Sequence, residues 1–200
     1  MLKNKRALTA LSALVALTGC ASYEADKLSM ISQESAILCK QSPDVSVAWK
    51  TFDKEDCKTY LDRNVISEGY VPVQVTIRND SKDPMYLNPN NFSVSVSPTT
   101  EVANKVHTST AGRIIAWTIP GLIITPFLIP AVYDGIKSSE ANKYLDADYE
   151  SKSIKEHTIK PYESFNGLVF VPKKEASEPL SLTLVNTTTG EKVLFNRISN

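Results

Sequence analysis

The chain of 200 residues has few of the side chains from which reactive centres are built. It holds two histidines and three cysteines, too few for a metal site rich in these ligands. Its seven glycines form no glycine-rich phosphate loop. A basic excess is also missing: residues 1–19 carry three bases and no acid, so the rest has 19 basic and 22 acidic side chains, a net charge of −3. The sequence therefore predicts no metal, no cofactor and no nucleic-acid partner.

Candidate catalytic residues are scarce as well. A nucleophilic hydrolase needs a positioned base, and the only histidines are His107 and His157. His107 precedes Ser109 in a polar stretch, which favours a solvated loop over a catalytic pair. His157 is expected at the surface, at the start of a strand. We therefore expect no catalytic residue and no enzymatic activity.

Three acidic residues in one short stretch resemble a calcium-binding ladder: Asp146, Asp148 and Glu150. They lack the glycine and the distal glutamate of an EF-hand loop. The pattern favours the solvated face of a helix over about residues 136–151.

The first twenty residues carry an export signal. Residues 1–6 are basic, residues 7–17 form an apolar run, and small residues precede Cys20, which together describe a secretory signal. A run of eleven residues, interrupted only by Thr9 and Ser12, is too short to span a bilayer as a helix. The sequence Leu17-Thr18-Gly19-Cys20 resembles the bacterial lipobox, in which the cysteine receives a diacylglycerol and becomes the new N-terminus.

This resemblance implies where the mature protein lies. Residues 1–19 are predicted to be a lipoprotein signal peptide, and the polar residues 20–35 a tether between the lipid on Cys20 and the folded domain. Ala21 stands where an aspartate usually marks retention at the inner membrane, so the resemblance implies the outer membrane. We expect the chain to face the periplasm, with the membrane as a partner through its N-terminal lipid.

The other two cysteines, Cys39 and Cys57, are expected to form a disulfide in this oxidising compartment. Their separation would contribute roughly 3 kcal/mol in the chain-entropy model. A redox-active pair would need closer spacing and flanking positive charge. Cys57 is expected on a short helix that Asp53 caps and that ends at Leu61.

Alternating apolar residues predict short strands. Val71, Val73, Val75 and Ile77 share one face of a half-buried strand that starts at Tyr70. Further strands are expected at residues 45–49, 85–87, 92–96, 157–160, 165–171, 180–184 and from residue 193. Trp49, near the first of them, is expected in the core. The pattern predicts a mainly β fold, an immunoglobulin-like antiparallel β-sandwich over residues 36–200, with a short N-terminal helical region.

The predicted sandwich is interrupted by an insertion at about residues 101–151. Residues 114–133 have no charge and match the length of a membrane-spanning helix. Three prolines, Pro120, Pro126 and Pro130, argue against one straight helix, so we expect an apolar helical hairpin or a re-entrant loop.

The insertion has two open roles: it packs on its own sandwich, or it contacts a membrane or a partner. Trp117 suits either a core or a lipid interface. The residues expected to make such contacts are Ile114, Ile115, Trp117, Leu122, Ile123, Ile124, Phe127, Leu128 and Ile129.

The stretch after the insertion resembles a loose group of uncharacterised bacterial outer-membrane lipoproteins whose immunoglobulin-like sheet is split by an apolar segment. The matching residues are Asn142, Leu145, Lys152, Ile159, Pro161, Gly167, Val169, Phe170, Val171 and Pro172. Tyr162 stands where the group usually has glycine. The resemblance covers about residues 70–195 and implies the fold and the anchoring, with no activity attached.

Two functions follow as hypotheses. The first is a non-enzymatic structural module of the cell envelope that docks a partner protein, for which exposed strand edges are suited. The second is a lipid-binding or membrane-inserting protein that uses residues 114–133.

Overall fold

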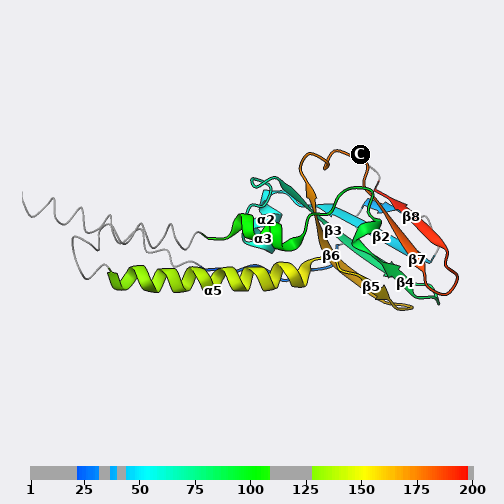
Figure 1. Cartoon of the computed structure of the whole chain (residues 1–200). Coiled ribbons are helices and arrows are strands. Elements are labelled where there is room, and N and C mark those ends of the chain that lie inside the picture. The colour runs from blue at the N-terminus through cyan, green and yellow to red at the C-terminus, as the bar shows by residue number, and fades with distance from the viewer. Residues whose placement is uncertain (1–21, 32–36, 40–43, 109–127, 198–200) are drawn as a thin grey trace, which may run out of the picture. The chain divides into compact units, whose positions relative to one another are not determined.

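The computed structural model describes residues 22–31, 37–39, 44–108 and 128–197 (Figure 1). The predicted signal peptide and Cys20 lie outside these residues. So do seven of the residues predicted to contact a membrane or a partner: Ile114, Ile115, Trp117, Leu122, Ile123, Ile124 and Phe127. For Leu128, Ile129 and Cys39 the structure describes the backbone alone.

The contacts of the chain divide it into two compact units, which are described separately. The larger one, residues 24–107 with residues 145–200, contains the described strands and is called the sheet unit. The smaller one, residues 1–23 with residues 108–144, is called the insertion unit because most of it falls in the predicted insertion.

The sheet unit is built from two antiparallel sheets (Figure 1). The first has the strand order β1-β2-β3-β6: β1 (Ile37–Cys39), β2 (Val45–Thr51), β3 (Tyr70–Asn79) and β6 (Ser164–Pro172). The second has the order β5-β4-β7-β8: β4 (Met85–Leu87), β5 (His157–Ile159), β7 (Ser181–Asn186) and β8 (Lys192–Asn196). The predicted antiparallel sheets are confirmed. The described residues also form three α-helices, so the class is mixed α/β instead of mainly β.

The two sheets share one apolar core. β3 sends Val73, Val75 and Ile77 into it, as the alternation predicted. Trp49 of β2 is also in this core, as expected, with its ring 6.1 Å from that of Phe92 in an edge-on contact. The second sheet contributes Met85, Leu87, Ile159, Leu182, Leu184 and Phe195. Burial of apolar side chains from both sheets is what holds the sheet unit together.

The strand predicted at residues 92–96 is wrong, although Phe92 and Val94 are buried in the core and the half-buried Val96 packs against it. The N–H of Ser93 donates to the carbonyl of Ser181 on β7 at 3.0 Å. The next N–H on that side, of Ser95, donates instead to the carboxylate of Glu175 at 2.9 Å. Successive backbone N–H groups on that side therefore donate to different segments of the chain, and this stretch forms no continuous β-ladder with one neighbouring strand.

α2 (Lys54–Leu61) begins and ends as predicted. The side chain of Asp53 accepts hydrogen bonds from backbone N–H groups of the first turn, in a capping box. Cys57 and Leu61 are buried, and Tyr60 is half-buried. The predicted face of this helix is therefore the one that packs.

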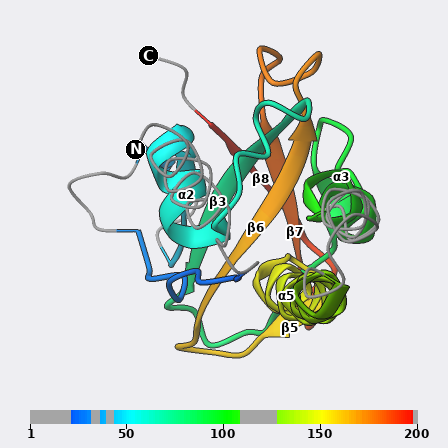
Figure 2. The same cartoon turned by 90° about the vertical axis from the view of Figure 1, so that its left-hand side faces the viewer.

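A second short helix, α3 (Thr99–Val106), was not predicted. It follows Pro98, and it buries Val102 and Ala103. The hydroxyl of Tyr70 on β3 donates to Glu101 of this helix at 2.6 Å. A 3₁₀ turn, η1 (Pro89–Asn91), lies earlier in the same connection. Figure 2 looks onto the end of the sheet unit at which α2 and α3 lie.

The long helix α5 (Leu128–Lys152) contains the helix predicted at about residues 136–151. Its buried face includes Ala141, Leu145 and Tyr149, as predicted, whereas Tyr144, expected on the same face, is 69% exposed. The helix also runs through Pro130, which was expected to break it. Pro130 is the third described residue of α5, so residue 126, whose carbonyl a helical N–H at this position would bond, lies outside the described part of the chain. None of the described helices is long and apolar enough to cross a bilayer.

Candidate functional site

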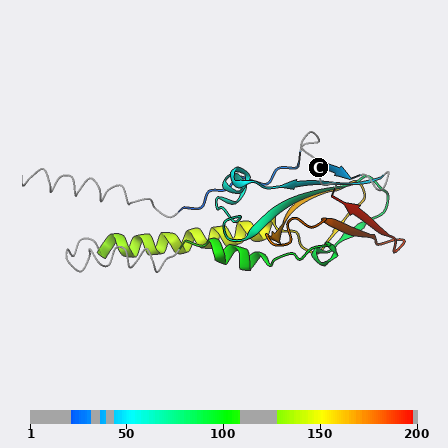
Figure 3. The ribbon, with the colours of Figure 1, turned by 90° about the horizontal axis from the view of Figure 1, so that it is seen from above.

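Residues 24–31, within the predicted tether, lie against the sheet unit and are called the strap (Figure 3). The strap belongs to neither a helix nor a strand. The rest of the sheet unit is called the body. Three backbone N–H groups of the strap donate hydrogen bonds to the body. Glu24 donates to the carboxylate of Asp62 at 3.3 Å, and Asp26 donates to the carbonyl of Thr59 at 2.9 Å. The N–H of Ile31 donates to the hydroxyl of Thr76, also at 3.3 Å.

Three backbone carbonyls of the strap accept hydrogen bonds from body side chains. The carbonyl of Ser29 accepts from the amides of Gln74 at 2.6 Å and Asn166 at 3.1 Å. Asn166 also donates to the carbonyl of Leu28 at 3.3 Å. The carbonyl of Asp26 accepts from the ammonium group of Lys152 at 2.8 Å.

All of these contacts use the main chain of the strap. Among the described residues, no side chain of the strap forms a hydrogen bond or an ion pair. Ala25, Leu28 and Ile31 are half-buried, and the other strap side chains are exposed. The body therefore recognises an extended backbone and three apolar positions spaced by three.

The amide part of this site lies on the outer face of the first sheet. Gln74 and Thr76 alternate with the core residues of β3, and Thr76 pairs in register with Asn166 of β6. The side-chain oxygen of Asn166 accepts from the amide of Gln74 and from the hydroxyl of Thr76, both at 2.9 Å. These bonds orient the Asn166 amide, so its NH₂ group points to the strap.

Lys152, at the end of α5, is an almost buried base whose side chain is 5% exposed. Its ammonium group donates to the carboxylate of Asp148 at 2.5 Å and to the carbonyls of Tyr60 at 2.7 Å and Asp26 at 2.8 Å. An ammonium group has three donors, and each has a partner here. Lys152 thereby joins α5, α2 and the strap.

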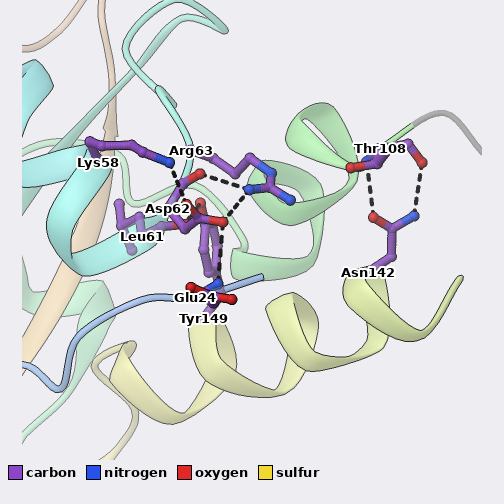
Figure 4. A network of polar contacts seen from close by, with 8 residues as sticks. All are labelled: Glu24, Lys58, Leu61, Asp62, Arg63, Thr108, Asn142 and Tyr149. Atoms are coloured by element: carbon purple, nitrogen blue, oxygen red, sulfur yellow. Dashed lines mark hydrogen bonds and ion pairs between the residues drawn. The ribbon is translucent and has the colours of Figure 1, made fainter. Parts of the chain in front are cut away.

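Asp62, the residue after α2, holds the start of the strap (Figure 4). Its backbone is left-handed, with φ of 51°, and its carboxylate accepts from Lys58 at 2.6 Å and pairs with Arg63. Burial opposes ionisation of this carboxyl, but the hydrogen bonds from Lys58 and from the Glu24 N–H and the charge of Arg63 outweigh it and hold the pKa of Asp62 below its ordinary value. The carboxylate is therefore a charged acceptor for the strap.

Tyr149 fixes α5 against the end of α2 beside this carboxylate (Figure 4). Its hydroxyl donates to the carbonyl of Leu61 at 3.2 Å, and its ring is stacked on that of Phe170 with 5.8 Å between centroids. Burial of the side chain raises the pKa of Tyr149. The tyrosine therefore acts as a neutral hydrogen-bond donor in the packing.

The acidic ladder on α5 has basic partners. Asp146 contacts the imidazole of His107 at 2.6 Å, Asp148 is held by Lys152, and Glu150 pairs with Lys155 at 2.7 Å. No cluster of three potential metal ligands occurs among the residues that the structure describes. Of these three contacts, only that of Asp146 with His107 joins α5 to another segment, since Lys152 is in the same helix and Lys155 follows it closely. Asp146 and Glu150 are exposed, as the predicted helix face requires, and Asp148 is half-buried.

The histidines have different environments. His107, just after α3, has the carboxylate of Asp146 as its partner, whereas Ser109 lies outside the described residues. His157 is exposed at the start of β5, as predicted, and its ring stacks on Phe165 at 5.0 Å.

In the insertion unit, the amide of Asn142 binds both backbone groups of Thr108 (Figure 4). It accepts from the N–H of Thr108 at 2.9 Å and donates to its carbonyl at 3.0 Å. The two residues enclose residues 109–141, so this paired contact closes the base of the insertion.

Cys57 is buried and forms no disulfide with a side chain that the structure describes. Burial, together with the charges of Asp56 and Asp53, raises its pKa to about 12, so the thiol is protonated and poorly nucleophilic. The disulfide with Cys39 stays a prediction, because the side chain of Cys39 lies outside the described part of the chain.

Several residues of the predicted resemblance have clear local roles. A Cβ atom on Gly167 would lie 2.7 Å from the side chain of Ile154, so only glycine fits there without a shift. Tyr162, at the position where glycine was expected, has φ of 62°. The turn after Pro161 therefore uses the left-handed backbone that favours glycine.

Comparisons of the chain with protein-family models, with curated proteins and with solved structures found no match.

Sequence reasoning missed the strap contacts. Lys152 and Asn142 were singled out within the resemblance, but the roles of Gln74, Thr76 and Asn166 were not anticipated. The available signal was the polar outer face of the strand at residues 70–79. Gln74 and Thr76 share this face, and their amide and hydroxyl groups can form hydrogen bonds with a backbone.

Proposed function

We propose that this chain is a lipid-anchored, non-enzymatic protein of the bacterial cell envelope, on the periplasmic side of the outer membrane. The lipobox-like sequence ending at Cys20 supports the anchor. We propose further that the body is an immunoglobulin-like β-sandwich that docks another envelope protein. Two antiparallel sheets around one core support that architecture.

The observation that carries this proposal is the docked strap. Glu24, its first residue, is only four residues from Cys20, and four extended residues reach at most about 14 Å. A free tether as far as residue 35 would reach about 50 Å. With the strap docked, an acylated Cys20 would keep the body next to the membrane surface, as a docking module in a fixed position requires.

The polar clusters favour docking over chemistry. Asp62, Lys152 and Asn166 each bind backbone groups from distant parts of the chain. Such contacts hold segments in place, and they are satisfied without any substrate. We therefore assign them to holding backbone segments against the sheet unit.

Mass spectrometry of the protein purified from its native envelope tests the anchor. We expect a mature N-terminus at Cys20 that carries a diacylglyceryl group and an added acyl chain. A Cys20→Ser variant should be absent from the membrane fraction. An unmodified, freely diffusing native protein would contradict the proposal.

A second candidate function is membrane insertion by residues 114–133. The observation in its favour is that the chain's contacts place residues 108–144 in a unit apart from the sheets. A segment of twenty residues without a charge is suited to burial in lipid.

Flotation with liposomes separates the two candidates. The Cys20→Ser chain removes the lipid anchor, so flotation would then depend on the apolar segment. Flotation that is lost with Ile123→Asp and Leu128→Asp would support insertion. A Cys20→Ser chain that never floats would favour the docking module.

A further inference from the structure

The side chains that hold the strap form a defined receptor. We call it the cradle: the side chains of Asp62, Gln74, Thr76, Lys152 and Asn166. Every hydrogen bond between the cradle and the strap uses a backbone N–H or carbonyl of the strap. Main-chain recognition gives affinity for an extended segment with little dependence on its side chains.

We propose that the cradle is a peptide-binding site, which accepts the backbone of an extended segment from a partner polypeptide in place of the strap. This inference deepens the docking role and rests on that proposed function. It does not depend on the lipid anchor, because all of the cradle lies in the sheet unit.

The cradle is organised by bonds within the body. Asn166 is held by Gln74 and Thr76, and Gln74 is only 3% exposed. Lys152 and Asp62 likewise have partners outside the strap, Asp148 and Lys58 among them. These bonds do not involve the strap, so the cradle keeps its shape when the strap leaves. Preorganisation of this kind favours binding of an incoming chain.

The strap is suited to exchange. None of its side chains is fully buried, so its departure exposes little apolar surface. Because the strap belongs to the same chain, it occupies the cradle at a high effective concentration. A partner segment therefore binds well only when the hydrogen bonds between the strap and the cradle are weakened.

The contacts define the partner segment chemically. It is an extended stretch of about eight residues with free N–H groups at the positions of Glu24, Asp26 and Ile31. Proline is excluded at those positions because it has no N–H. Apolar residues are preferred where Ala25, Leu28 and Ile31 are half-buried, and the other positions accept any side chain.

The test uses the mature chain with Cys20→Ser and a fluorescent peptide of residues 22–33. The substitutions Asp26→Pro and Ile31→Pro remove two N–H donors from the strap and leave the cradle unchanged. Lys27→Pro with Met30→Pro is the matched control, because no described contact uses the N–H of Lys27 or Met30. We expect the first double variant to bind the peptide at least about tenfold more tightly than the control pair or the unsubstituted chain.

Two further peptides test main-chain recognition. A peptide altered at the positions of Lys27, Ser29 and Met30 should bind within about threefold of the original, because these side chains are exposed. A peptide with proline at the positions of Asp26 and Ile31 should not bind. Asn166→Ala, added to the variant with the freed cradle, should weaken binding about tenfold, because two of the contacts to the peptide backbone are lost.

Failure of the freed cradle to bind the peptide, with its thermal unfolding unchanged, would overturn the inference. Strong dependence on the exposed side chains would overturn it as well. A one-to-one complex between the freed variant and the unsubstituted chain in sedimentation would assign the cradle to a second copy and contradict a foreign partner. A native protein without a lipid on Cys20 would contradict the proposed membrane anchor, and the peptide-binding results would not depend on it.

Discussion

The two faces of β3 hold different parts of the chain by different means. The inner face carries Val73, Val75 and Ile77 into a dry core, whereas the outer face uses Gln74 and Thr76 to hold the strap through hydrogen bonds. Apolar burial is non-directional and large, and each hydrogen bond adds only about 1 kcal/mol net. The core therefore sets whether the sheet unit folds, and the outer face sets only where the strap lies.

The largest effect is expected on the inner face. Ile77→Ala removes a fully buried side chain from the core and leaves a cavity, so we expect a loss of about 2–5 kcal/mol in the free energy of unfolding. Urea unfolding followed by fluorescence measures it. A loss below about 1 kcal/mol would mean that the two sheets do not share the packed core described here.

Lys152→Met tests the junction of α5, α2 and the strap. The methionine keeps an apolar chain but leaves the carboxylate of Asp148 and two carbonyls without their donor, so we expect a loss of about 1–3 kcal/mol. Lys155→Met is the matched control. Its ion pair with Glu150 is exposed, so its effect should stay below about 0.5 kcal/mol. Equal effects of the two variants would contradict the junction.

Asn166→Ala tests the outer face alone. The variant loses two hydrogen bonds to the strap, which should weaken its docking by about 1.4 kcal/mol. Because that corresponds to a factor of about ten, we expect trypsin to cleave after Lys27 roughly tenfold faster. Global unfolding should change by about 1 kcal/mol or less. Asn90→Ala, at an exposed side chain, is the control and should leave the cleavage rate unchanged. Unchanged cleavage in the Asn166→Ala variant would argue against a docked strap.

The pH dependence of Asp62 has a defined sign. Its pKa is lower in the folded protein than its ordinary value of 3.8, so its contribution to stability is fully present above that value and is lost as the pH falls through the folded pKa. Asp62→Asn keeps a residue that tolerates the left-handed backbone. The difference in unfolding free energy between the two proteins should be largest near neutral pH and shrink below pH 3.8. A difference of the same size at neutral pH and below pH 3.8 would mean that the charge of Asp62 does not contribute to stability.

These contrasts explain what the sequence predicts and what it does not. The period of two placed the core face of β3 correctly, and Asp53 marked the start of α2, because both signals are local. The bond between Gln74 and Asn166 joins residues 92 positions apart, and no local pattern announces it. The irregular backbone at residues 92–96 was missed for the same reason, since its partners come from separate segments.

Amide hydrogen exchange of the mature chain, resolved by residue, shows whether the strap is docked on the outer face of the first sheet. We expect slow exchange at the N–H groups of Asp26 and Ile31, which donate to the rest of the sheet unit, and fast exchange at those of Lys27 and Met30. Uniformly fast exchange across residues 24–31 would contradict a docked strap.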